Sequence, residues 1–264
     1  MEAKAVAIAI VLLLLTFEED GFGVSSYKVD WKEDSTPYRS PVSKAQTRHQ
    51  HIKVQTGMLF LKKSLHVGTI LPEGTMFARA GLPKPDSSVS TPLQPMYLAT
   101  ILSHFKIGRN SMKAKQVADT LRSCSKPSDM EEPQMCFSSR GEMAGFATKE
   151  LGVRRARAAI TTIHGHESPR SRYIVARITP VSTNMVACHP MDFPYEVYYC
   201  HRPKEVESFR VQLKEQENDM PLVTTTAMCH MNTFNWDKQY FELLGGERGE
   251  PICHYMPQNY IMFY

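Results

Sequence analysis

Residues 188–201 read CHPMDFPYEVYYCH, a segment that begins and ends with the dipeptide Cys-His. The same dipeptide returns at residues 229–230 and 253–254, so it occurs four times in the last third of the chain. The intervals between successive dipeptides are 10, 27 and 22 residues. Four of the 6 cysteines and four of the 10 histidines belong to these dyads. Both residue types are uncommon, so chance adjacency does not explain the pattern.

The dyads separate two kinds of chemistry if they lie in extended chain. Adjacent side chains of a strand point to opposite faces, so each cysteine can face one layer while its histidine faces another. Six cysteines in an oxidising compartment favour three disulfides. Cys124 and Cys136, twelve residues apart, are expected to pair, and their short loop contributes about 3 kcal/mol in the chain-entropy model. The remaining four can pair in three ways, which the sequence leaves open: Cys188, Cys200, Cys229 and Cys253.

The N-terminal sequence predicts export. Residues 1–26 resemble a secretory signal peptide, with Lys4 before the apolar stretch Ala5 to Thr16 and small residues after it. That stretch is shorter than the about 20 apolar residues that a membrane span needs. A buried helix or an uncleaved anchor is the alternative. We expect cleavage, a secreted apoplastic protein that leaves the membrane, and a polar linker without repeats over residues 27–57.

Composition limits the function further. The hydrophobic fraction of 42% supports a packed core, and the formal charge of +4 arises from 31 basic and 27 acidic residues scattered along the chain. We therefore expect no nucleic-acid partner. The chain has no His-Glu-x-x-His, Gly-x-Ser-x-Gly, Walker or Gly-x-Gly-x-x-Gly pattern, which argues against hydrolases and nucleotide-binding enzymes of those families.

Hydrophobic periodicity predicts an α+β fold, with a helical middle section followed by a mostly antiparallel, disulfide-stapled β region. Helices are expected over residues 96–105, 112–122 and 139–151, the last of which stops at Gly152. The β-like segments that follow are residues 158–163, 173–178, 184–188, 195–201, 209–214, 222–230 and 251–255.

The dyad spacing CH-X10-CH-X27-CH-X22-CH resembles the BURP domain of secreted plant proteins. Leu59-Phe60 stands where that family carries paired phenylalanines, and Phe263 stands where it closes with tryptophan. Cys124, Cys136 and the segments 142–147, 193–195 and 197–199 are similar to further parts of the family. The resemblance covers residues 58–264.

The resemblance implies a role for the dyad histidines. Some BURP proteins are copper-dependent cyclases that oxidatively link a tyrosine or tryptophan side chain within a peptide. By motif position, the candidate metal ligands are His189, His201, His230 and His254. Imidazoles without an available thiolate favour Cu(II), Ni(II) or Zn(II), and copper binds most strongly in the divalent series. The alternative is that these histidines are packed structural residues.

The sequence is compatible with two functions of different classes, a binding protein and an enzyme. Whether the protein is an enzyme is therefore left open. In the first, a secreted non-catalytic protein binds a cell-wall polymer or another protein during development or stress. In the second, the chain is an autocatalytic cyclase that forms oxidative Tyr or Trp cross-links. Self-modification needs an aromatic residue in flexible chain, and the arm before the domain offers Tyr27, Trp31 and Tyr38 once each. The lack of repeats there favours the first function.

Overall fold

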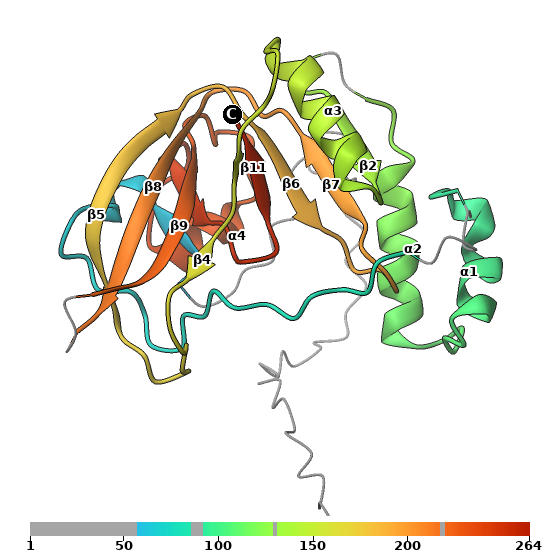
Figure 1. The fold of residues 1–264 in the computed structure, drawn as a ribbon, viewed down its shortest axis with the longest axis horizontal. Coiled ribbons are helices and arrows are strands. Elements are labelled where there is room, and N and C mark those ends of the chain that lie inside the picture. The colour runs from blue at the N-terminus through green and yellow to red at the C-terminus, as the bar shows by residue number, and fades with distance from the viewer. Residues whose placement is uncertain (1–56, 86–91, 129–130, 217–219) are drawn as a thin grey trace, which may run out of the picture. The chain divides into compact units, whose positions relative to one another are not determined.

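A computed structural model describes residues 57–85, 92–128, 131–216 and 220–264 (Figure 1). The predicted signal peptide and residues 27–56 of the predicted linker lie outside these ranges, and Gly57 is the first described residue. Among the described residues, none of the helices combines the length and the apolar run that crossing a membrane requires.

The described chain is a mixed structure of helices and antiparallel sheets. Its elements in chain order are β1 (Leu59–Leu61), η1 (Lys62–Ser64), η2 (Pro95–Tyr97), α1 (Leu98–His104), α2 (Met112–Cys124), β2 (Gln134–Phe137), α3 (Arg140–Leu151), β3 (Ala158–Ala159), β4 (Thr162–Ile163), β5 (Tyr173–Ser182), β6 (Val186–Pro190), β7 (Tyr198–His201), β8 (Val206–Glu215), β9 (Pro221–His230), α4 (Lys238–Leu244), β10 (Ile252–Tyr255) and β11 (Ile261–Phe263). Mixed helix and antiparallel sheet is what the hydrophobic periodicity predicts.

The larger sheet has the strand order β1-β10-β9-β8-β5, and β4 also pairs with β9. Its centre is the long antiparallel pairing of β8 with β9, in which Val211 lies opposite Thr225. One set of alternating side chains forms a core with the segment between η1 and η2. Its members are all nearly inaccessible to solvent: Phe77, Tyr173, Val175, Val211, Leu213 and Val223. Alternation of this kind is typical of a sheet with one face on a core.

The smaller sheet has the order β2-β7-β6-β11-β3. One of its faces is covered by α3, which packs Met143, Ala147 and Leu151 against Val186 and Phe263. Figure 1 shows α3 beside β2, β6 and β7. The apolar side chains at 3, 4 and 8 spacing along residues 143–151 therefore form the buried side of this helix.

The opposite face of the smaller sheet meets the larger sheet along a seam of buried side chains. The seam consists of Met185, Ala187, Val206, Met228, Met256 and Met262. Four of these six are methionines, whose flexible thioether chains fill irregular gaps between packed layers. The dyad histidines lie on the same two faces as this seam, as described below.

Two predicted helices have the ends that their sequences indicate. Ser111 caps α2 by accepting a hydrogen bond from the amide of Ala114 at 3.1 Å. Ser139 caps α3, and Gly152 ends it in the left-handed conformation at φ 68°. The predicted helix over residues 96–105 is a 3₁₀ turn, which begins at Pro95, followed by the shorter α1.

The segment 158–163 was predicted as one strand, but the structure divides it between the two sheets. β3 pairs with β11 in the smaller sheet, and β4 pairs with β9 in the larger one. Thr161 lies between them, 4% exposed, and its hydroxyl bonds to the hydroxyl of Thr225 at 2.8 Å and to the carbonyl of Met256. Satisfying this buried hydroxyl fixes the crossing point.

The predicted order of a helical middle followed by a β region is only partly correct. β1 precedes the helices, β2 lies between α2 and α3, and α4 interrupts the β region. Asp237 caps α4 by accepting from the amide of Gln239, and Gly245 ends it at φ 63°. The helix is stabilised by burial of Phe241 against Leu59, Leu61 and Trp236. Leu59 and Leu61 are distant in sequence from Phe241, so local periodicity did not reveal this packing.

Candidate metal centre at the Cys-His dyads

The four dyads lie on neighbouring strands, two in each sheet. Cys188-His189 is in β6 and Cys200-His201 in β7 of the smaller sheet, and Cys229-His230 ends β9 beside Cys253-His254 of β10 in the larger sheet. The antiparallel registers place the two cysteines of each pair directly opposite one another. Each sheet therefore carries its own pair of aligned dyads.

All six cysteines are joined in three disulfides. They are Cys124–Cys136, Cys188–Cys200 and Cys229–Cys253. The first disulfide is the one predicted from the sequence. The other two together form one of the three pairings that the sequence leaves open for the dyad cysteines. The sulfurs of Cys188 and Cys200 pack into the core under α3. Every thiolate that could compete for a metal is thereby removed.

The disulfide registers decide where the histidines lie. With Cys188 opposite Cys200, His189 lies opposite Tyr199 and His201 opposite Ala187. The two imidazoles are then diagonal neighbours on the face that does not carry the disulfide. In the larger sheet, His230 lies opposite Ile252 and His254 opposite Met228, which repeats this diagonal arrangement.

The two histidine pairs meet across the seam and form one row of imidazoles. His189 Nε2 lies 3.1 Å from His201 Nε2. The ring centroids are 5.2 Å apart for His189 and His201, 6.0 Å for His189 and His254, and 5.7 Å for His254 and His230. Their exposures are only 4 to 8%. The fold thus brings all four predicted ligands together, from both sheets, in a buried place.

Glu132 orients the first ring of this row. Its carboxylate lies 3.0 Å from Nδ1 of His201, and both side chains are largely shielded from solvent. A carboxylate accepts hydrogen bonds, so Nδ1 carries a proton, and neutral His201 then presents the lone pair of Nε2 to His189. A carboxylate behind a histidine is the usual support of a metal-binding imidazole. No sequence signal identified Glu132, because its contact depends on the pairing of β2 with β7.

The distance between the two Nε2 atoms fits a shared ion. Two nitrogens at about 2.0–2.1 Å from one metal are about 2.9 Å apart at a right angle and about 3.4 Å apart at a tetrahedral angle. The 3.1 Å between His189 and His201 falls between these values. Without a metal, a hydrogen bond from His189 Nε2–H to His201 Nε2 satisfies the same pair. The His189–His201 pair is thus the part of the row best arranged for an ion.

The row as a whole is not yet a complete coordination shell. Across the described ranges, no group of three or more His, Cys, Asp or Glu side chains is arranged to hold a metal ion. His254 and His230 continue the row at stacking distance from one another.

Aromatic side chains enclose the row. Tyr260 meets His189 edge to face with ring centroids 5.2 Å apart, and Trp236 lies 5.0 Å from His230. Tyr199 lies 5.5 Å from His201. Burial raises the pKa of Tyr260, and its hydroxyl therefore stays protonated beside the imidazoles. The aromatics exclude water from the histidines.

Of the other two histidine pairs, the described one, His164 and His166, does not join this centre. His164 bonds the hydroxyl of Thr224 at 3.0 Å on the exposed side of β9, and His166 is also exposed. His49 and His51 lie outside the described residues. Among the described histidines, those of the four dyads alone belong to the candidate centre.

Comparison with known proteins identifies the family of this chain. A family model of the BURP domain matches residues 58–264, which include all four dyads. The chain belongs to the BURP domain family. BURP proteins similar to it include BURP domain-containing protein 4 of rice (Oryza sativa subsp. japonica), 44% identical over 233 residues that cover 80% of this chain and 48% of the relative.

Two further relatives carry other names. Protein RAFTIN 1B of wheat (Triticum aestivum) is 31% identical over 217 residues, which cover 79% of this chain and 59% of the relative. Polygalacturonase 1 beta-like protein 3 of Arabidopsis thaliana is 26% identical over 256 residues, which cover 92% and 39%. The chain spans about half the length of the curated relatives it matches. These three relatives all come from plants.

Proposed function

We propose that this chain is a secreted plant BURP protein that acts without catalysis in the apoplast or cell wall, during development or stress, and holds copper at its dyad histidines. The observation that carries the proposal is the row of four buried imidazoles, headed by the 3.1 Å contact of His189 with His201. Its partner is a cell-wall polymer or another protein. Secretion accords with three disulfides, which persist in oxidising compartments.

The donor set favours copper. The cysteines are all oxidised, so imidazole nitrogens are the donors that remain at the dyads. Imidazole suits copper, nickel and zinc, and Cu(II) is the strongest binder in the divalent series. His189 and His201 would hold the ion, with His254 and His230 next in the row. Copper, when bound, supplies a centre that can change between two oxidation states.

Burial favours the non-catalytic function over the cyclase. A cyclase must bring a tyrosine or tryptophan side chain of a peptide to the metal. Here the four imidazoles are at most 8% exposed, and Trp236, which borders them, is 3% exposed. The aromatic residues of the arm, Tyr27, Trp31 and Tyr38, lie outside the described residues. A buried row suits an ion that is retained rather than a substrate that enters and leaves.

Intact mass and metal analysis of the secreted chain test both parts of the proposal. After incubation with Cu(II) and oxygen, native mass spectrometry should show bound copper, and denatured mass spectrometry should show the mass of the three-disulfide chain unchanged. Each oxidative cross-link removes two hydrogens, so a loss beyond the three disulfides would establish the cyclase instead. A chain that retains no copper after desalting would contradict the metal site.

A further inference from the structure

The three disulfides differ in how far solvent reaches them. The four dyad cysteines are 0% exposed, so a reagent in solution cannot reach their sulfurs while the chain is folded. Cys124 and Cys136 are only partly buried against the core that α1 and α2 share, and the neighbouring Ser125 and Met135 are exposed. Thiol–disulfide exchange requires a thiolate to reach a sulfur of the bond. The Cys124–Cys136 bond is therefore the one that a soluble thiol reaches first.

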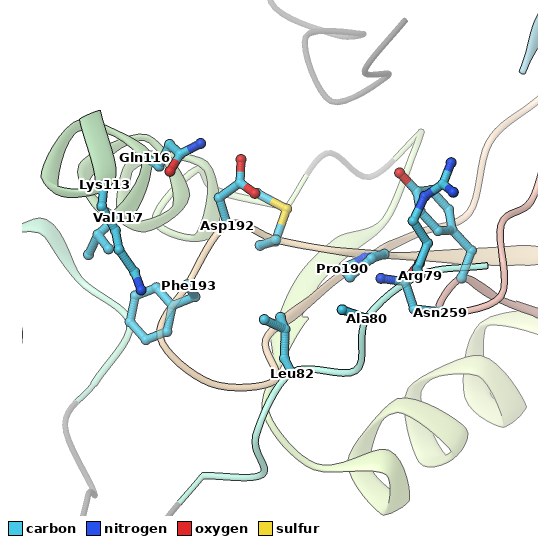
Figure 2. Close-up of a pocket in the computed structure, with 12 residues that line it drawn as sticks. Arg79, Ala80, Leu82, Lys113, Gln116, Val117, Pro190, Asp192, Phe193 and Asn259 are labelled. Carbon is cyan, nitrogen blue, oxygen red and sulfur yellow. The ribbon is translucent and has the colours of Figure 1, made fainter. Parts of the chain in front are cut away.

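This disulfide joins two elements of unequal attachment, and α2 is the firmly held one. Val117 and Leu121 on this helix are 0% exposed in the core shared with α1. The hydroxyl of Thr120 donates to the carbonyl of Asp192 at 3.0 Å, which ties the helix to the loop after β6. In Figure 2, Gln116 of α2 and Asp192 line the same cavity of about 330 Å³. The helix therefore keeps its place when the disulfide opens.

Strand β2 depends more on the disulfide. It has four residues and lies at the end of the smaller sheet, where β7 is its neighbour. Phe137 anchors its last position, with its ring centroid 5.3 Å from that of Phe146 in α3. The bond from Cys136 to α2 is the covalent tether ahead of that position. A pairing of two strands is marginally stable by itself in water. Opening the bond therefore loosens the first half of β2.

The first half of β2 and the segment before it contact a histidine of the row. Gln134 lies directly opposite His201 in the register of β2 with β7. Its side-chain oxygen accepts from the hydroxyl of Tyr199, whose ring lies 5.5 Å from that of His201. Glu132, two residues earlier, lies 3.0 Å from Nδ1 of His201. The loop that the disulfide closes therefore contains the groups that orient this imidazole.

We propose that Cys124–Cys136 is a thiol-exchange site, which a dithiol reductant opens while the dyad disulfides stay closed, and whose opening weakens copper binding at His201. One thiolate of the dithiol attacks a sulfur of the bond and forms a mixed disulfide, which the second thiol then resolves. The dithiol leaves as a disulfide, and its two hydrogens and two electrons end on Cys124 and Cys136. The copper effect rests on the metal site proposed above, whereas the selective reduction does not.

Partial reduction of the secreted chain tests the selectivity. The folded protein is treated with dithiothreitol for increasing times, the free thiols are blocked with iodoacetamide, and peptide mass spectrometry measures the blocked fraction of each cysteine. Blocking of Cys124 and Cys136 should be at least about tenfold faster than blocking of the dyad cysteines, because reduction depends on access to the sulfur. Simultaneous reduction of all three bonds, or earlier reduction of a dyad bond, would overturn the exchange site.

Copper affinity of the opened chain tests the coupling. The selectively reduced and blocked chain, freed of dithiothreitol, is compared with a Cys124→Ser, Cys136→Ser double variant by competition with a chelator. Both should bind Cu(II) about 10- to 100-fold more weakly than the parent chain, the usual effect of losing the group behind a ligating histidine. Met135→Ala is the control, since Met135 is 52% exposed on the same strand and its loss leaves the disulfide intact. Parent affinity in both opened forms would refute the coupling.

A second substitution separates this effect from general loosening of the fold. Glu132→Gln should cause little further loss of Cu(II) affinity in the double serine variant, because the contact of Glu132 with His201 is already lost there. Full additivity of the two losses would show that the disulfide does not act through Glu132 and would overturn the coupling. A parent chain that binds no copper would refute the metal site together with the coupling, while the peptide map decides the exchange site independently.

Discussion

The carboxylate of Glu132 lies 3.0 Å from Nδ1 of His201, on the far side of the ring from the Nε2 atom that faces His189. This contact fixes both the tautomer and the orientation of the imidazole before any ion is present. Glu132 belongs to the segment before β2, so the pairing of β2 with β7 contributes directly to the proposed metal site.

Replacing Glu132 by Gln should weaken copper binding about 10- to 100-fold, the usual effect of removing the partner that orients a ligating histidine. A neutral amide neither fixes the Nδ1 proton as firmly nor offsets the charge of the ion. Copper affinity is measured by competition with a chelator of known affinity. Glu131→Gln is the matched control, because Glu131 is exposed and lies 3.5 Å from Lys204 instead. Equal loss in both variants would mean that Glu132 acts only through overall charge.

The four dyad histidines should differ from the other histidines of the chain. His201→Ala and His230→Ala should each lower Cu(II) affinity by at least about tenfold, because each removes a ligand from the row. His164→Ala, on the exposed side of β9, should change little. Isothermal titration of each folded variant with Cu(II) gives the comparison. The same affinity in all of them would show that the row is structural.

Acid should also release the ion, since protons compete for neutral imidazole.

The two dyad disulfides should stabilise the fold by loop closure. Cys188 and Cys200 are 12 residues apart, so replacing both with alanine should cost about 3 kcal/mol in the chain-entropy model. The separation of 24 residues for Cys229 and Cys253 gives about 3.5 kcal/mol. Urea denaturation of the double-alanine variants measures both losses. Thiol titration of the denatured parent chain should find no free sulfhydryl, and two reactive thiols would contradict the pairing.

Buried tyrosines should make the fold sensitive to alkali. Burial raises the pKa of a set of phenols: Tyr173, Tyr195, Tyr198, Tyr240, Tyr255 and Tyr260. Unfolded tyrosine ionises near about pH 10, so a raised folded pKa gives stability that is complete below this pH and is lost above it. The free energy of unfolding in urea should therefore begin to fall near about pH 10 and keep falling as the pH rises toward the folded pKa values.

Tyr255→Phe provides the control for this pH dependence. The variant lacks one phenol whose pKa burial raises, so its stability should fall less steeply with alkali than that of the parent chain. Tyrosinate absorbance followed during unfolding reports the ionisation directly. Phenols that ionise in the folded chain near their ordinary pKa, with no loss of stability, would contradict the expectation.

The sequence could predict the parts of this fold that depend on local pattern. The caps at Ser111 and Ser139 and the stop at Gly152 are local signals, and α2 and α3 begin and end close to where these residues place them. The strands that carry the dyads were also recognisable, because β-branched and aromatic residues surround them. The resemblance to the BURP domain identified the family from the dyad spacing, and the family match agrees.

The rest depended on contacts between distant segments. No periodic pattern shows that Glu132 meets His201, since that requires β2 to join the smaller sheet beside β7. The helix α4 was missed although Asp237 and Gly245 are ordinary cap residues, because the seven residues between them are too few for a clear helical period. The partition of residues 158–163 between two sheets likewise follows from tertiary packing around Thr161.

The repeated crossing of the chain between the two sheets has a consequence for how the protein can fold. Segments of the smaller sheet come from β2, β3, β6, β7 and β11, and those of the larger sheet are interspersed among them along the chain. Neither sheet is a continuous piece of sequence, so neither can form as an autonomous folding unit. A chain cut after β10 would lose β11, the partner that lies between β6 and β3. Such a fragment cannot complete the smaller sheet, so we expect productive folding to require β11 as well as the strands before it.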